Sequence, residues 1–183
     1  MKFEEKIEEL KRSEEKVSGA IDDIKEELNS SNKDSSLAIK KRFISSINIL
    51  LDINGYRIEG DGIKVKAGYI IAKPRNKRKN RLFLIAYSSS LNSAFIYKKL
   101  QSCEKVAANN SCDKNNIYFI YCKSSVSDKV DKKIQEYNPA TIRAISLEND
   151  DFTRILLLAS EKVDDKEKNN IAMEYGKCMS LEV

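Results

Sequence analysis

The chain has 183 residues, of which 33 % are charged and 41 % are hydrophobic, and its formal net charge is +5. This length and composition suit one folded domain with an appendage. No apolar run approaches the roughly 20 residues that a membrane-spanning helix needs, and the first residues lack the basic-then-apolar order of a signal peptide. We therefore expect no membrane association and a cytoplasmic location.

Histidine is absent, which removes the commonest general base and the commonest ligand for transition metals. The same absence excludes a Ser-His-acid triad. The four cysteines show no Cys-x-x-Cys spacing, so a zinc site is not expected. The chain also lacks the Gly-x-x-x-x-Gly-Lys-Ser/Thr loop of P-loop proteins. These patterns predict neither a metal centre nor another cofactor.

The charge is unevenly distributed along the chain. Residues 1–28 carry ten acidic and six basic residues, a net charge of −4. Residues 37–105 carry fifteen basic and four acidic residues, a net charge of +11, whereas residues 106–183 have a net charge of −2. A basic segment between two mildly acidic ones is the electrostatic pattern expected of a protein that binds a phosphate backbone.

Residues 1–30 are predicted to form a charged amphipathic helix in which apolar residues alternate at intervals of four and three. This is the heptad period of a coiled coil, with Glu14 at the single polar step and Gly19 as a second weak point. Two readings stay open, a dimerisation helix and a long helix packed on its own domain. The residues that would form a dimer interface are Phe3, Ile7, Leu10, Val17, Ile21, Ile24 and Leu28.

A polar, Ser- and Asn-rich stretch over 29–36 is the best linker in the chain, and an α/β domain is predicted over 37–183. Ser35 or Ser36 is expected to cap a helix over 37–52, which Gly55 ends. The later elements follow from apolar periodicity. Strands are predicted near 56–58, 63–65, 68–72, 82–88, 117–122 and 141–147, and helices near 92–108, 126–138, 152–163 (capped by Asn149) and 168–179.

The two strands over 68–72 and 82–88 flank a strongly basic connection, KPRNKRKNR, which has six cations and no acid. A connection of this length is predicted to project from the sheet as a basic arm. Strands joined by hairpins, followed by a strand-helix-strand crossover, imply a mixed sheet with helices on both faces. The fold class predicted is therefore α/β, with a mixed sheet.

The order of elements from 37 to 147 resembles the αβββαβ core of the restriction-endonuclease-like, or PD-(D/E)XK, superfamily. The resemblance implies a nuclease fold in which carboxylates hold Mg²⁺, and the metal activates water. In this chain Gly68 stands where the first acid should be. Ile85, Ala86 and Tyr87 stand where Glu-x-Lys should be, and no acid occurs between Asp61 and Glu104. The resemblance therefore implies a fold that has lost its catalytic site.

An atypical metal site at Glu59 and Asp61, beside Lys64 or Lys66, is the one alternative that would keep nuclease activity. The Glu-Gly-Asp-Gly sequence there is also what a tight turn requires. We favour the turn. On this reading the chain has no catalytic residues.

The function that the sequence favours is binding of nucleic acid, most simply DNA, by a homodimer without catalysis. The contacts would be made to phosphates, which give affinity without base recognition. A coiled-coil scaffold that binds no nucleic acid is the alternative. The candidate phosphate contacts are Lys64, Lys66, Lys73, Arg75, Lys77, Arg78, Lys79 and Arg81.

Overall fold

The structure is a computed structural model that describes residues 2–30, 33–59, 69–76, 80–87, 93–110, 112–137 and 142–181. Within these ranges the chain forms six α-helices and a five-stranded sheet. The helices are α1 (Lys2–Asn29), α2 (Lys33–Ile53), α3 (Ser93–Asn109), α4 (Asp128–Tyr137), α5 (Asn149–Leu156) and α6 (Asp165–Cys178). The strands are β1 (Tyr56–Ile58), β2 (Tyr69–Pro74), β3 (Asn80–Ala86), β4 (Cys112–Cys122) and β5 (Arg143–Leu147). None of these helices combines the length and apolar character needed to cross a membrane.

The sheet is mixed, and its strands lie in chain order from β1 to β5. Strands β1, β2 and β3 are antiparallel neighbours, whereas β3, β4 and β5 are parallel. Parallel neighbours require crossover connections, which α3 and α4 supply. The predicted combination of hairpin-connected strands and strand-helix-strand crossovers is confirmed.

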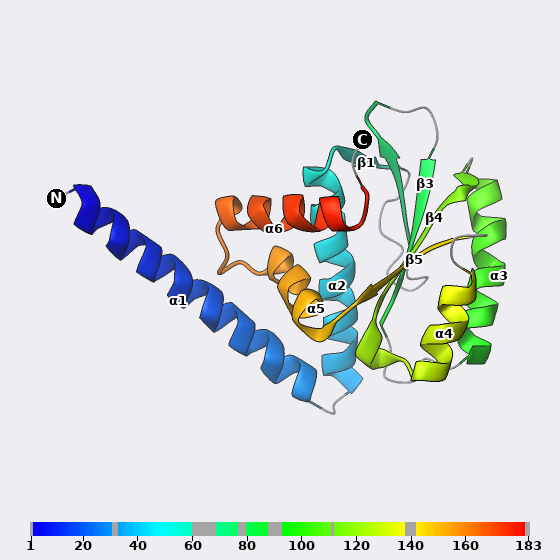
Figure 1. Cartoon of the computed structure of the whole chain (residues 1–183), viewed down its shortest axis with the longest axis horizontal. Helices are drawn as coiled ribbons and strands as arrows, with labels where there is room; N and C mark the ends of the chain where they lie inside the picture. The colour runs from blue at the N-terminus through cyan, green and yellow to red at the C-terminus, as the bar shows by residue number, and fades with distance from the viewer. Residues whose placement is uncertain are drawn as a thin grey trace.

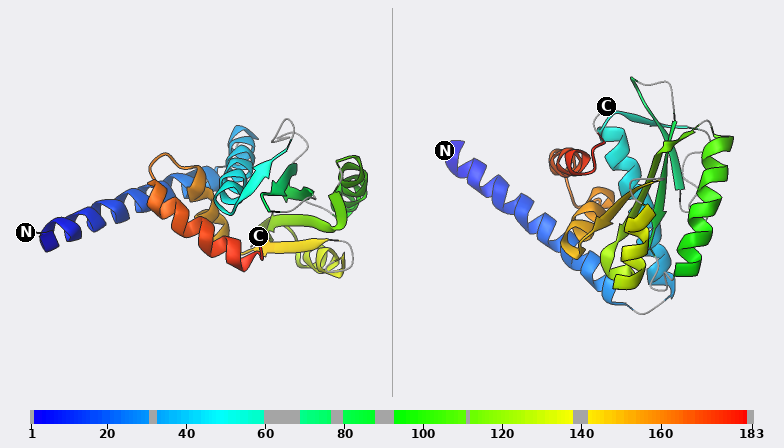
Figure 2. Two further views of the ribbon diagram at one scale, coloured as in Figure 1. Left: turned by 90° about the horizontal axis from the view of Figure 1, so that it is seen from above. Right: turned by 45° about the vertical axis from the view of Figure 1, so that its right-hand side comes forward.

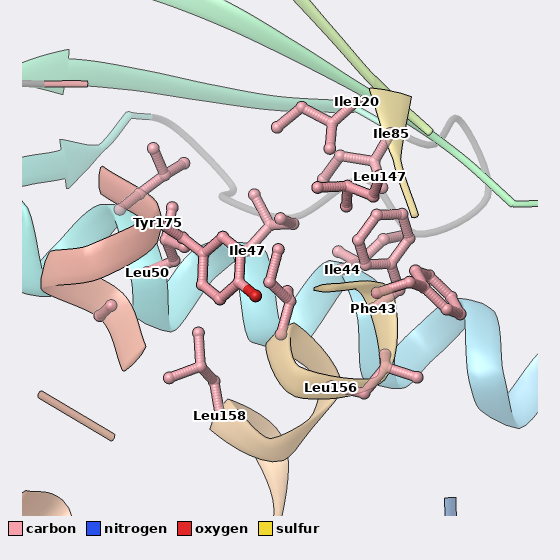
Figure 3. Close-up of a cluster of buried hydrophobic side chains, with 14 of the residues drawn as sticks. Phe43, Ile44, Ile47, Leu50, Ile85, Ile120, Leu147, Leu156, Leu158 and Tyr175 are labelled. Carbon is pink, nitrogen blue, oxygen red and sulfur yellow. The ribbon is translucent and has the colours of Figure 1, made fainter. Parts of the chain in front are cut away.

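Each face of the sheet is covered by helices (Figures 1 and 2). Helices α2, α5 and α6 cover one face, and α3 and α4 cover the other. The apolar run of β4 serves both faces, because Tyr118 and Ile120 point to the first core and Ile117 and Phe119 to the second. In Figure 3, side chains from α2, including Phe43, lie between the sheet and α5 and α6.

Several predicted boundaries are wrong. Polar residues extend the beginnings of α2, β4, α5 and α6, whereas α5 ends earlier than predicted, and the strand predicted near 63–65 lies outside the described residues. Helix α2 begins at Lys33, so Ser36 lies inside the helix, and β4 begins at Cys112. Asn149 is the first residue of α5 and does not cap it, and α5 ends at Leu156 before a short 3-10 turn, Leu157–Ala159. Helix α6 begins early because the Asp164 carboxylate accepts a hydrogen bond from the Glu167 backbone N–H at 2.8 Å.

Helix α1 is divided between two environments. Its second half packs on the domain, where Ile24 is fully buried and Val17, Ile21 and Leu28 contact the same core. Its first half projects away from the domain (Figure 1). The predicted dimer interface is therefore wrong for Ile24, which its own chain already covers. The exposed part of the stripe consists of Phe3, Ile7 and Leu10, which are 77 %, 41 % and 60 % exposed.

Two ion pairs fix the packed half of α1 to the domain. The Arg42 guanidinium of α2 lies 2.8 Å from the Glu27 carboxylate, and both side chains are partly buried. The Lys162 ammonium lies 2.5 Å from the Asp23 carboxylate. These contacts bind the helix to both α2 and the segment before α6, so the second half of α1 is an integral part of the core.

Candidate nucleic-acid interface

Basic side chains gather where β2 ends and where β1, β3 and β5 begin. Antiparallel pairing of β2 with both neighbours brings these ends together. In register, Arg57 lies opposite Lys73, and Arg81 lies opposite Ala72. We call this region the basic end of the sheet. Its described basic residues are Arg57, Lys73, Arg75, Arg81 and Arg143.

Arg57 and Lys73 form a like-charged cross-strand pair. Residues directly opposite in an antiparallel pair point to the same face with closely spaced Cβ atoms, and like charges there are destabilising. Arg57 has a salt-bridge partner in Glu59, with 3.8 Å between the charged atoms, but its side chain is 77 % exposed and the pair is weak. An anion placed between Arg57 and Lys73 would relieve their repulsion.

Arg75 extends the basic end beyond the last residue pair of β1 and β2. Its backbone N–H donates a hydrogen bond to the Gly55 carbonyl at 3.0 Å, and Gly55 has a φ of +86°, a left-handed conformation that favours glycine. The Arg75 side chain is 63 % exposed and lies 3.5 Å from the exposed Asp52 carboxylate. The backbone is thus held in place while the guanidinium remains accessible.

The structure corrects the position of Arg81. This residue belongs to β3 and is only 9 % exposed, because strand alternation directs it toward the face that α2 and α6 cover. Its guanidinium donates to the Tyr56 hydroxyl at 2.5 Å and to the Tyr118 hydroxyl at 3.1 Å, and it lies near both rings. Arg81 is therefore a core residue and is removed from the candidate phosphate contacts.

Arg143 is a basic-end residue that the sequence reasoning missed. It begins β5, is exposed, and donates to the Tyr118 hydroxyl at 3.4 Å with its guanidinium 5.5 Å from the ring centre. It lies in the mildly acidic third segment of the sequence, so the charge pattern gave no reason to select it. The parallel pairing of β4 with β5 is what places it beside Tyr118.

Burial raises the pKa of Tyr56, and the nearby Arg81 guanidinium only partly opposes this effect. The hydroxyl of Tyr56 therefore stays protonated at neutral pH and donates to the Leu181 carbonyl at 3.1 Å. This contact places the segment after α6 beside the basic end. The pair of Tyr56 and Tyr118 thus supports the strands that carry the exposed cations.

Five of the predicted phosphate contacts lie outside the described residues: Lys64, Lys66, Lys77, Arg78 and Lys79. Asn76 and Asn80, which precede and follow the last three of these in the chain, are both at the basic end. Of the described residues that were predicted, the structure brings Lys73 and Arg75 together at an accessible surface. It adds Arg57, which lies opposite Lys73, whereas Arg143 lies on β5 and on the other face of the sheet.

Two of the positions that the nuclease resemblance aligns with catalytic residues, 85 and 87, have side chains that the structure describes. Ile85 is buried in the core, and Tyr87 stacks on Phe152 with 5.3 Å between ring centres. Gly68 and Asp61 lie outside the described residues. Within the part of the chain that the structure describes, no three Cys, Asp or Glu residues are grouped closely enough to hold a metal ion.

A cavity of about 320 Å³ lies at the opposite end of the sheet, where β3 and β4 end. The Cys122 sulfur lies 3.2 Å from the Ser124 hydroxyl, and burial together with the neighbouring Cys122 raises the pKa of Tyr87. The cavity contains one carboxylate, so its lining does not supply the paired acids of a two-carboxylate metal site. It is lined by Lys25, Leu28, Asn29, Tyr87, Cys122, Ser124, Asn149, Asp150, Phe152 and Thr153.

No protein-family model matches this chain, and no curated protein matches it in sequence. Function is therefore inferred from contacts, burial and charge. The cavity offers mixed polar and apolar groups without a recognisable catalytic arrangement. The basic end offers exposed cations whose mutual repulsion favours an anionic ligand.

Proposed function

We propose that this protein binds nucleic acid, with DNA as the first candidate, through phosphate contacts at the basic end of the sheet. The observation that carries the proposal is the direct opposition of Arg57 and Lys73 on one face. The exposed side chain of Arg75 follows Lys73 at the end of β2, and exposed Arg143 adds a cation on the opposite face of the sheet, beside Tyr118. Contacts of this kind would give salt-dependent affinity with no direct base recognition.

We also propose that the segment from α2 to β4 is a restriction-endonuclease-like core without catalytic activity. Its helix, three antiparallel strands, helix and parallel strand follow the order that the resemblance implies. The identity of Ile85 supports the lack of activity, because a buried aliphatic side chain offers no oxygen ligand to a metal ion. The expected product of incubation with DNA and Mg²⁺ is uncut DNA.

The test is a binding titration with fluorescently labelled duplex and single-stranded DNA. The variant combines Arg57→Gln, Lys73→Gln, Arg75→Gln and Arg143→Gln, and we call it the basic-end variant. A matched control replaces four exposed lysines elsewhere, Lys105, Lys129, Lys132 and Lys166, by glutamine. Both variants have the same net charge, so only a localised interface distinguishes them.

We expect the basic-end variant to lose at least tenfold in affinity and the control to lose less than threefold. Loss of a few phosphate contacts accounts for such a change at moderate salt. Equal losses in the two variants would mean that affinity follows net charge alone. Wild-type protein that fails to bind either DNA near physiological salt would reject the proposed function.

A second candidate function is self-association through the projecting half of α1. The observation that favours it is the exposure of Phe3 and Leu10 at heptad spacing. On this reading the protein is a scaffold, and its basic end contacts an acidic protein. Sedimentation of wild type and Leu10→Ala over a range of concentrations tests it, with concentration-dependent mass expected for wild type alone.

A further inference from the structure

The apolar stripe of α1 has an exposed part and a part that is packed on the domain. Phe3, Ile7 and Leu10 are exposed, whereas Val17, Ile21, Ile24 and Leu28, which continue the same stripe, contact the domain core. A heptad stripe occupies one side of a helix along its whole length. Because these residues share one stripe, the domain lies on the side of α1 from which the exposed residues project.

This geometry excludes a parallel pair of α1 helices. In a parallel pair the stripes of both helices face each other at every level, including the level of Ile24. At that level each helix already has its own domain against the stripe. Two domains would then occupy the space between two helices that must approach within about 10 Å.

In an antiparallel pair this collision does not arise. The domain packs on α1 from Val17 onward. When residues 3–14 of the two helices overlap, Val17 of one copy lies beyond the amino end of α1 in the other copy. We propose that two copies of the chain associate through an antiparallel pairing of these residues, with Ile7 of one copy opposite Leu10 of the other. This inference rests on the proposed self-association and adds its orientation and register.

The flanking charges agree with this orientation. In the proposed register Glu4 of one copy lies beside Lys11 of the other, and twofold symmetry makes two such attractive pairs. A parallel pair would instead place Lys6 beside Lys11 of the second copy and Glu14 against its own equivalent, whereas the antiparallel register separates the two Glu14 residues and places each at the end of the overlap, opposite Phe3. All four charged side chains are exposed in the single chain and are accessible for pairing.

The paired segment is short. Stable two-stranded coiled coils usually need three to four heptads, and residues 3–14 provide about two. The association is therefore expected to be weak and reversible, with a dissociation constant in the micromolar range or above. It would bring two domains together at high local concentration, on DNA for example, without forming a permanent dimer.

Cysteine cross-linking tests the register in full-length protein in which Cys103 and Cys178 are serine. Ile7→Cys and Leu10→Cys proteins with different tags are oxidised separately and as a mixture. Antiparallel pairing predicts a cross-link mainly in the mixture, between position 7 of one copy and position 10 of the other. Cross-links that form equally well within each separate protein would overturn the orientation.

Charge reversal provides a second test. Lys11→Glu replaces two attractive pairs by two repulsive pairs and should weaken association about tenfold, given a few tenths of a kcal/mol for each exposed pair. Glu4→Lys combined with Lys11→Glu should restore it. Stronger association of Lys11→Glu would instead indicate a parallel pair, in which Lys6 faces the new Glu. A wild-type protein that stays monomeric at millimolar concentration would reject self-association itself.

Discussion

The Arg81 guanidinium donates a hydrogen bond to the Tyr56 hydroxyl at 2.5 Å, and the same hydroxyl donates to the Leu181 carbonyl at 3.1 Å. This chain of contacts joins β3, β1 and the segment after α6 beneath the basic end. Arg81, although it belongs to the strongly basic connection, therefore stabilises the basic end from within the core. The exposed cations around it are the ones available for binding.

Replacement of Arg81 should mainly affect stability, whereas replacement of Arg75 should mainly affect DNA binding. Arg81→Gln removes the hydrogen bonds to Tyr56 and Tyr118 and should reduce the free energy of unfolding by about 2 kcal/mol. Arg75→Gln should change stability by less than about 0.5 kcal/mol, because the side chain is exposed, yet reduce DNA affinity. Urea unfolding and DNA titration of both variants measure the two effects. Unchanged stability of Arg81→Gln would contradict the structural role of Arg81.

Gly176 in α6 is needed for the close approach of Asn54. A Cβ at this position would lie 2.0 Å from the side-chain oxygen of Asn54. The side-chain NH₂ group of Asn54 is held in place because it donates hydrogen bonds to the Leu50 and Ala172 carbonyls at 2.8 Å each. Gly176→Ala should cost about 2 kcal/mol of stability, despite the better helix propensity of alanine.

Gly19→Ala is the matched control for Gly176→Ala. Among the described residues, no atom other than those of the adjoining residues and backbone of α1 lies within 4 Å of the added Cβ at Gly19, which is also helical. This change should stabilise the protein by about 0.5 to 1 kcal/mol. Thermal or urea unfolding measures both variants. Equal effects of the two substitutions would show that the contact with Asn54 has no energetic importance.

The two halves of α1 should respond differently to alanine. Ile24→Ala removes a fully buried side chain and should cost 2 to 5 kcal/mol. Leu10→Ala should leave the unfolding free energy of dilute protein within about 0.5 kcal/mol of wild type, since Leu10 is exposed. Unfolding at low protein concentration separates these outcomes from self-association. A large loss in Leu10→Ala under those conditions would mean that the first half of α1 packs on its own domain.

The raised pKa of Tyr121 leads to a predicted loss of stability at alkaline pH. Burial and a hydrogen bond to the Asp131 carboxylate at 2.5 Å raise the pKa of Tyr121 to about 12. Because the folded pKa exceeds the usual value near 10, its contribution is present below pH 10 and is lost as the pH rises toward 12. Wild type should therefore lose stability more steeply than Tyr121→Phe between pH 10 and 12. If the free energy of unfolding fell equally with pH in wild type and in Tyr121→Phe, the raised pKa of Tyr121 would be contradicted.

Much of the fold follows from apolar periodicity. The apolar runs of β3 and β4 identify the central strands, because both faces of the sheet are covered. The boundaries were harder to predict. Asp164, and not Asn149, supplies a side-chain cap, and either residue type is suitable for that role.

Less of the candidate site could be predicted. The basic connection identified Lys73 and Arg75, but it also suggested Arg81, because charge patterns do not show that a strand has already begun at Asn80. Arg143 reaches the site only through the pairing of β4 with β5. The heptad in α1 allowed packing on its own domain as one of two readings, but it did not indicate that only the second half would be covered.

The salt dependence of DNA binding tests the central proposal most directly. The logarithm of the association constant falls linearly with the logarithm of salt concentration, by about 0.9 for each phosphate contact to duplex DNA. If the four cations that the basic-end variant replaces all contact phosphates, the slope for this variant should be smaller in magnitude than that for wild type by about 3 to 4. Equal slopes for wild type, the basic-end variant and the matched lysine control would contradict the proposal.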